Sequence, residues 1–275
     1  MRISELAIHP LKSARRLVVP ELALDALGPA QDRRWMLVDA AGAFVTQRTH
    51  PRLCLLAATP VPGGLQLAAP GRDDLVVPVP DGTVDAAGTV AARVWNDTVA
   101  ARPALPAAHA WCSDFLGLPV RLLHMPDDAV RAVDPHYAGP GHRTAFSDGF
   151  PLLLVTQSSL DHLNRRLAAE GAPAVDWARF RPNVVVAGDL PPHAEDGWRR
   201  LRVGEVELAL VKPCSRCVIP SIDPATAVKD SRILTILRAY RRRPDGKVYL
   251  GQNVVVARAA PGARLRQGDT VEILE

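Results

Sequence analysis

The side chains best suited to chemistry lie in the segment VKPCSRCVIPSIDP, where Cys214 and Cys217 form a C-x-x-C pair. Thiolates at this spacing can bind zinc, exchange disulfides, or ligate a soft metal that a cofactor carries. Pro213 and Pro220 restrict the backbone on either side. An isolated pair without a function is the ordinary alternative, so the surrounding residues must decide between these possibilities.

The first two kinds of chemistry are disfavoured. A zinc site needs two further Cys or His ligands, but Cys54 and Cys112 lie in apolar runs that are typical of buried small side chains. A thioredoxin-type dithiol opens a helix, whereas Val-Ile-Pro after Cys217 argues against one. The third kind is ligation of a cofactor metal by one thiolate, with Arg216 favouring the charged sulfur. It requires an anion-binding pocket nearby.

The first part of the chain has the pattern of a β domain. Short alternating or apolar runs, broken by turn residues, extend from Ile3 to about Val99, and their spacing suits a barrel or sandwich. Hairpin turns are predicted at 39–42 and 62–64. A helix at 107–116 and a strand at 120–124 follow, and then a Pro-, Gly- and His-rich loop at 125–143, whose length is typical of a functional segment.

The second part is again rich in strands. A buried strand in FSDGFPLLLVTQ precedes a helix that Ser158 or Ser159 could cap and Gly171 would end. Further elements are predicted as a strand in FRPNVVVAG, a hairpin in RLRVGEVELALVKP, a helix at 233–241, a strand in GQNVVVAR and a strand at 270–274. We therefore predict a mainly β fold with a few helices (α+β), divided near residue 125.

Composition narrows the class of protein. The chain has 275 residues, of which 48% are hydrophobic, enough for one large or two modest domains. It lacks both a long apolar run and a secretory signal, so we expect a cytoplasmic protein without membrane contact. The formal net charge is +4, but the arginines are scattered, and RAYRRRP is typical of a solvated helix end. No nucleic-acid partner is expected.

Several separated segments resemble one family. PLKS, DRRWMLVD, THPRL, FSDGFPLLLVTQSSLDHLN, FRPNVVVAG, AEDGW, KPCSRC and LGQN occur in the order seen in MOSC proteins with an N-terminal MOSC β-barrel domain. The chain is similar to the bacterial YcbX group and to the mitochondrial amidoxime-reducing components. The resemblance implies a β-barrel-like N-terminal domain at 1–125 and a MOSC β-barrel domain at 126–275, with the cofactor at their seam.

The resemblance also implies roles for individual residues. Cys217 would be the metal ligand and catalytic, and Cys214 only its neighbour. Asn183 and Asn253 are the other residues expected to be catalytic, with Asn253 on the substrate side. The cofactor would be bound by Lys12, Ser13, Arg33, Thr156, Ser159, Arg181, Asn183, Ser215 and Arg216. Ser159 could equally be a helix cap, and Asp148 is expected only to bond turn amides.

The activity that the resemblance implies is reduction of small N-hydroxylated substrates such as amidoximes, hydroxylamines and N-hydroxylated bases. A molybdenum-pyranopterin cofactor (Mo-molybdopterin) would carry the reaction. Residues 1–275 contain no C-x4-C-x2-C iron–sulfur motif, so the electrons are expected from a separate ferredoxin or flavoprotein reductase type of donor. The alternative is a cofactor carrier or sulfur-transfer protein, and binding of pyridoxal phosphate is a secondary association of the family.

Overall fold

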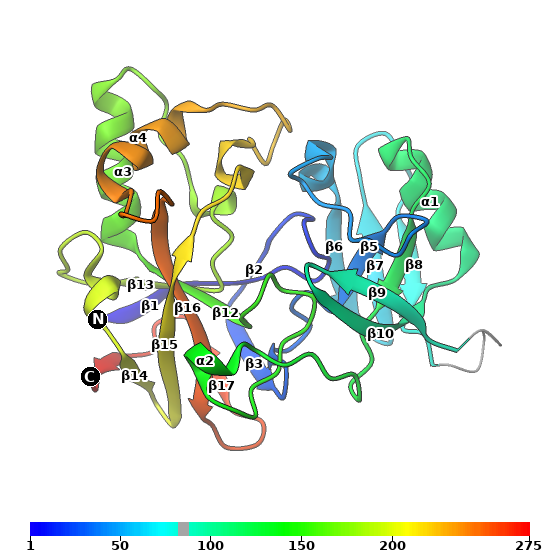
Figure 1. The fold of residues 1–275 in the computed structure, drawn as a ribbon, viewed down its shortest axis with the longest axis horizontal. Helices are drawn as coiled ribbons and strands as arrows, with labels where there is room; N and C mark the ends of the chain where they lie inside the picture. Colours follow the sequence, from blue (N-terminus) through cyan, green and yellow to red (C-terminus); the bar gives the residue numbers. More distant parts are fainter. Residues whose placement is uncertain (82–87) are drawn as a thin grey trace.

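The computed structural model describes residues 1–81 and 88–275 and shows two lobes (Figure 1). One lobe is built on a large sheet that two helices cover, and the other contains two smaller sheets and one helix. Strands dominate, and the described residues form four α-helices. The predicted α+β fold with a β majority is confirmed.

The large sheet has eight strands and draws on both parts of the chain. All its neighbouring strands are antiparallel except β12 and β13, which run parallel. In spatial order the strands are β18 (Val271–Ile273), β14 (Arg200–Val203), β15 (Val206–Ser215), β16 (Tyr249–Arg258), β12 (Leu152–Thr156), β13 (Val184–Ala187), β1 (Arg2–Ile8) and β2 (Leu17–Val19). The first strands of the chain therefore complete a sheet made mostly by its second half. The division at residue 125 stays a prediction.

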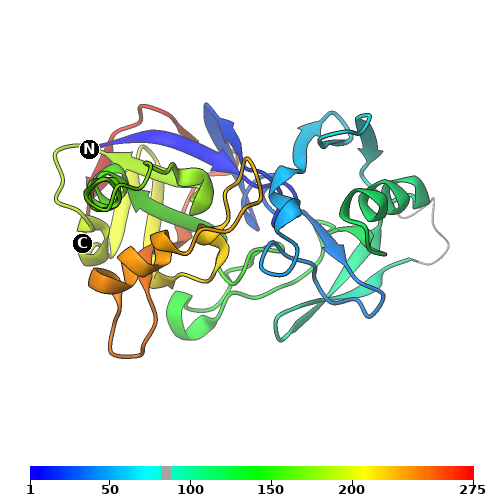
Figure 2. The same cartoon turned by 90° about the horizontal axis from the view of Figure 1, so that it is seen from above.

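The second lobe contains a four-stranded and a three-stranded sheet (Figures 1 and 2). The four-stranded sheet consists of β5 (Trp35–Val38), β11 (Arg121–His124), β10 (Asp97–Pro103) and β9 (Val90–Val94). The other consists of β6 (Ala57–Val61), β7 (Gly64–Ala68) and β8 (Leu75–Pro78), and α1 (Pro106–Leu116) packs beside it. A third small sheet, formed by β17 (Arg264–Arg266), β3 (Glu21–Asp25) and β4 (Gly28–Pro29), again joins the two ends of the chain.

Helices α3 (Gln157–Ala169) and α4 (Arg232–Arg241) pack on the large sheet. The leucine face of α3 is buried there, through Leu160, Leu163 and Leu167, and burial of one such side chain contributes about 1.5–3 kcal/mol. The predicted cap is wrong, because the helix starts two or three residues earlier and its N-cap residue is Thr156. The hydroxyl of Ser159 turns inward to a buried carboxyl group instead.

Short elements occupy the connections. The long loop at 125–143 contains one brief helix, α2 (Pro135–Ala138), which lies against β15. The described residues also form four 3-10 helices, η1 (Pro51–Leu55), η2 (Trp177–Arg179), η3 (Ala194–Gly197) and η4 (Ile219–Ser221). The last of these follows the C-x-x-C segment, so no α-helix begins there. Three connections, after β1, before β13 and after β15, meet at one place between the lobes.

Candidate functional site

A cavity of ≈ 120 Å³ opens where these three connections meet. A larger outer hollow of ≈ 950 Å³ continues from it. The two spaces share as wall residues Arg48, Asp148, Phe150 and residues 214–217, which we call the cysteine loop. Most residues predicted for the site line the cavity, namely Lys12, Ser13, Arg33, Arg181, Asn183, Ser215, Arg216, Cys217 and Asn253. Thr156 and Ser159 do not. Residues separated by up to 241 positions in the chain are thus gathered around one space.

Three of the wall residues have an unusual backbone conformation. Ser13, Arg33 and Arg181 adopt φ angles of 66°, 48° and 59°, in the left-handed region that non-glycine residues seldom enter. Such conformations cost free energy and persist where the surrounding structure imposes them, which is common at binding sites. Each places a polar or cationic side chain in the cavity wall.

The cysteine loop begins where β15 ends. The Arg216 amide donates to the Val248 carbonyl over 2.7 Å, which fixes the loop to the start of β16. The Arg216 guanidinium donates to Cys214 Sγ over 3.1 Å and to the Phe180 carbonyl over 2.8 Å. Its Nε is buried without a hydrogen-bond partner among the described residues. Cys214 is therefore engaged by Arg216, while Cys217 faces the cavity as a free thiol.

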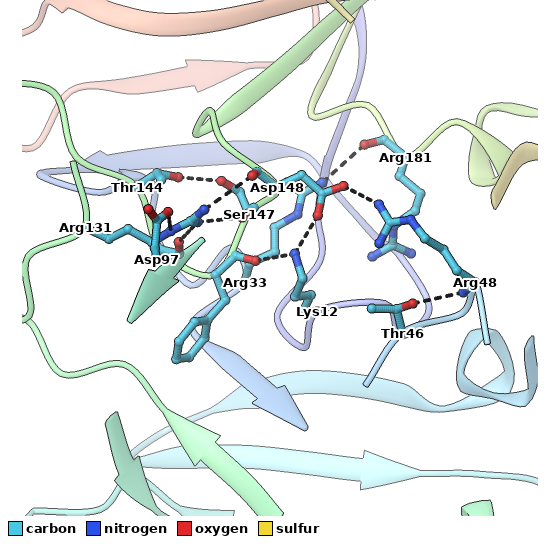
Figure 3. A network of polar contacts seen from close by, with 12 residues as sticks. Lys12, Arg33, Thr46, Arg48, Asp97, Arg131, Thr144, Ser147, Asp148 and Arg181 are labelled. Carbon is cyan, nitrogen blue, oxygen red and sulfur yellow. Dashed lines mark hydrogen bonds and ion pairs between the residues drawn. The ribbon is translucent and has the colours of Figure 1, made fainter. Parts of the chain in front are cut away.

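Asp148 joins two cations, Lys12 and Arg48 (Figure 3). Lys12 Nζ donates to one carboxylate oxygen over 2.7 Å, and Arg48 donates to the other over 2.7 Å. Burial opposes ionisation of Asp148, but Lys12 and Arg48 hold its pKa well below the usual range. The expectation that Asp148 only bonds turn amides is wrong, because its oxygens bind side chains from two distant segments.

Arg48 also contacts Cys217, the residue that is expected to bind the metal. Burial tends to lower the pKa of Arg48, but Asp148 and Cys217 raise it above its ordinary value. The guanidinium thus contacts Cys217 through a side-chain hydrogen bond. Sequence reasoning missed Arg48, since QRTH carries no local signal for a site, although the adjoining segment THPRL belongs to the family resemblance.

Asn183 orients Arg33. Its Oδ1 accepts from Arg33 over 3.0 Å and from the Leu153 amide over 3.1 Å, while Nδ2 donates to the Ala7 carbonyl over 3.1 Å. Arg33 is also paired with Asp32. With its amide engaged on three sides, Asn183 is placed to position Arg33, and this geometry favours a supporting role over the predicted catalytic one.

Arg181 is a cation without a counter-ion. Its guanidinium donates to the Ala14 carbonyl, and no carboxylate among the described residues lies within ion-pair distance. Burial, together with Arg33, lowers its pKa from its ordinary value to about 9. Burial also lowers the pKa of Lys12 from 10.5 to about 8, although Asp148 opposes that change. Since the cavity wall carries five cationic side chains and one carboxylate, an anion is the ligand that it would stabilise.

Thr156 and Ser159 belong to a separate buried cluster. Thr156 Oγ1 donates to Glu195 over 2.6 Å, and Ser159 Oγ lies 3.2 Å from both oxygens of the same carboxyl group. All three side chains are buried. Burial raises the pKa of Glu195, and the two hydroxyl groups only partly offset this effect. The structure thus brings these two residues to Glu195 and not to the cavity.

Asn253 and the remaining cysteines are placed as follows. Asn253 lines both the cavity and the outer hollow, and its Nδ2 donates to the Lys212 carbonyl over 3.2 Å. Cys54 and Cys112 are buried, and burial raises the pKa of Cys112 to about 12.

Among residues 1–81 and 88–275, no group of three or more His, Cys, Asp or Glu side chains could hold a metal ion by itself. Within the same ranges, no helix is long and apolar enough to span a bilayer.

Comparison with known proteins places the chain in a family. Residues 1–119 match the MOSC N-terminal beta barrel domain, and residues 141–272 match the MOSC domain. The chain is 34% identical to mitochondrial amidoxime-reducing component 1 of Homo sapiens, over 99% of the chain and 82% of that protein. It is 31% identical to mitochondrial amidoxime reducing component 2 of Bos taurus, over 87% and 72%.

A solved structure, the YUAD protein of Bacillus subtilis, aligns with 98% of the chain and 93% of its own length at 10% identity. Its TM-score of 0.37 is too low to support an argument. The names of the relatives mention neither pyridoxal phosphate nor a cytoplasmic location. From both domain matches and the near full-length similarity, the chain belongs to the family of MOSC proteins with an N-terminal MOSC β-barrel domain, together with the mitochondrial amidoxime-reducing components.

Proposed function

We propose that this protein is a molybdenum cofactor-dependent oxidoreductase that reduces N-hydroxylated compounds. One observation carries the proposal. The thiol of Cys217 shares a single cavity wall with Lys12, Arg33 and Arg181, although these residues come from four distant segments. The relatives named as amidoxime-reducing components support the direction of the reaction.

The chemistry of the wall fits a phosphorylated cofactor with a soft metal. Lys12, Arg33 and Arg181 offer charge-assisted hydrogen bonds to phosphate, and Ser13 adds a hydroxyl group beside them. The unpartnered Arg216 Nε is a further donor at the cysteine loop. When bound, the cofactor would supply a metal centre able to accept an oxygen atom from the substrate. The residues present therefore match the group that the family implies.

The residues of this protein would bind the cofactor, orient the substrate and set the surroundings of the metal ligand. Cys217 would be the protein ligand, and Arg48 would hold its sulfur through a side-chain hydrogen bond. Asn253 would face the substrate, because it borders both the cavity and the outer hollow. Asp148 would hold Lys12 and Arg48 in place in the cavity wall. We propose a separate electron-donor protein and a cytoplasmic setting for this activity.

The first test is metal retention. Purified from a host that makes molybdenum cofactor, the wild type should hold close to one molybdenum per chain by elemental mass spectrometry. Cys217→Ala should retain no more than about one tenth of that molybdenum, since a metal–thiolate bond is lost. Cys214→Ala is the matched control in the same loop and should keep its metal. Unchanged molybdenum in Cys217→Ala would overturn the assignment.

A second measurement separates a reductase from a cofactor carrier or sulfur-transfer protein. After chemical reduction of the metal-loaded protein, benzamidoxime should reoxidise the centre and yield benzamidine, as followed by absorbance and product analysis. A carrier would hold molybdenum and release it to an acceptor protein without consuming benzamidoxime. Failure to oxidise the reduced centre would therefore support that alternative.

A further inference from the structure

The outer hollow has cationic residues in its wall that do not line the cofactor cavity, and Lys212 is one of them. Lys212 lies in β15, five residues before Cys217, and its carbonyl oxygen accepts the hydrogen bond of Asn253. Its ammonium group lies 3.9 Å from the centre of the Tyr137 ring and 5.8 Å from that of Phe150. No carboxylate among the described residues pairs with it. Aromatic rings stabilise the cation, but they do not neutralise it.

The carboxylates of the hollow are already engaged. Asp148 is bound by Lys12 and Arg48, and Asp97 accepts from Arg131 over 2.7 Å. Asp134 accepts from the His136 amide over 3.0 Å at the start of α2. By contrast, the cationic residues of the hollow without an ion-pair partner among the described ranges are Lys212, Arg216, Arg238 and Lys247. The hollow therefore has positive charge to offer a ligand.

Aromatic surface lines the same space. Phe150 borders both the cavity and the hollow, and its ring packs edge-on against Tyr137 with centroids 6.2 Å apart. Trp95 lies in the wall and is 46% exposed, while Arg48 covers one side of its ring at 4.7 Å. A flat molecule could contact these rings while a negative group on it reached the ammonium of Lys212.

We infer that the preferred substrates are flat N-hydroxylated compounds that carry a carboxylate or phosphate group, and that Lys212 selects them. The inference rests on the proposed reductase function and specifies its substrate class. Because Phe150 borders both spaces, a substrate held there can present its N-hydroxyl group toward Cys217 and its acidic group toward Lys212. The positive charge of Lys212 in the hollow favours the anionic compound in binding.

The test compares two compounds that differ by one charge. With metal-loaded protein, kcat/KM for 4-carboxybenzamidoxime should exceed that for benzamidoxime by about tenfold. In Lys212→Met the ratio should fall to about one or two, while Lys212→Arg should restore most of it because the charge returns. Lys229→Met removes an exposed lysine outside the hollow and should keep the wild-type ratio. A ratio near one in the wild type, or an unchanged ratio in Lys212→Met, would refute the inference.

A binding measurement keeps this result distinct from failure of the reductase proposal. Benzoate and benzamide are unreactive probes of the same shape, and calorimetry should show tighter binding of benzoate that depends on Lys212 but not on Lys229. If neither amidoxime is reduced yet benzoate binding shows this dependence, the anion-selecting site stands and the reductase function fails. If amidoximes are reduced but benzoate shows no preference, only the inference about Lys212 fails.

Discussion

The cofactor cavity and the Glu195 cluster are two polar groups in the same fold, and they differ in how their charges are neutralised. In the cluster, Thr156 and Ser159 satisfy Glu195 within the protein. In the cavity, Arg181 lacks any carboxylate partner among the described residues, and Lys12 depends on one carboxylate that it shares with Arg48. Buried polar groups whose hydrogen bonds are all made within the protein are typical of a structural role. Positive charge that no carboxylate neutralises is typical of a site that binds an anionic ligand.

Removing the unpaired cation should give the largest effect. Arg181→Gln should weaken retention of the cofactor by about 10- to 100-fold, because a charge-assisted hydrogen bond contributes about 1.5–3 kcal/mol. The melting temperature of cofactor-free protein should stay the same or rise, since burial disfavours the free guanidinium. Molybdenum content after dilution and dialysis checks the first effect, and calorimetry checks the second.

Arg179→Gln is the control for that substitution. Arg179 is already paired with Asp223 at 2.8 Å and does not line the cavity. Its loss should therefore lower stability and leave molybdenum content intact. If Arg181→Gln behaved in the same way, the contrast between the cavity and the closed cluster would be mistaken.

A smaller effect is expected from pH. Burial lowers the pKa of Lys12 to about 8, so in cofactor-free protein its ammonium form is present below that value and is lost as the pH rises through it. Sulfate keeps a fixed charge and serves as the probe anion, and its affinity should fall about threefold to tenfold between about pH 7 and about pH 9. Isothermal calorimetry measures the change. Lys12→Arg should largely remove it, and an equal fall in that variant would assign the titration to another group.

The smallest effect is expected in the Glu195 cluster, whose polar groups are satisfied within the protein. Thr156→Val removes the 2.6 Å hydrogen bond to buried Glu195 and should lower the free energy of unfolding by about 1–2 kcal/mol. Because Thr156 does not line the cavity, molybdenum content should match that of the wild type. Denaturant unfolding and metal analysis of the same preparation give both values. Loss of metal without loss of stability would show that Thr156 contributes to cofactor binding, as the family resemblance implied.

Much of the fold was predictable because local patterns dominate it. The leucine spacing of α3, the hairpin of β14 and β15 and the apolar run of β12 each follow from short segments. The helix start was misplaced because the sequence does not reveal Glu195, which draws the Ser159 hydroxyl inward. The fold class therefore follows from short-range signals, and exact boundaries depend on partners far along the chain.

Prediction of the site was less complete, for two physical reasons. Arg48 and Asp148 are 100 positions apart, and only tertiary packing brings them together beside Cys217. The left-handed backbone of Ser13, Arg33 and Arg181 is likewise imposed by the surroundings and not by residue type. The family resemblance supplied Lys12, Arg33 and Arg181, but neither Arg48 nor the Asp148 carboxylate that binds Lys12 and Arg48.

The pairing of β1 with β13 has a consequence for synthesis of the protein. Residues 2–8 leave the ribosome long before residues 184–187, the only strand that separates β1 from β12 in the sheet described here. Until then the first strand has an open edge, and the loop that carries Lys12 has no fixed position. Nascent chains should therefore need protection from aggregation, and the cofactor can be inserted only after most of the polypeptide has been translated.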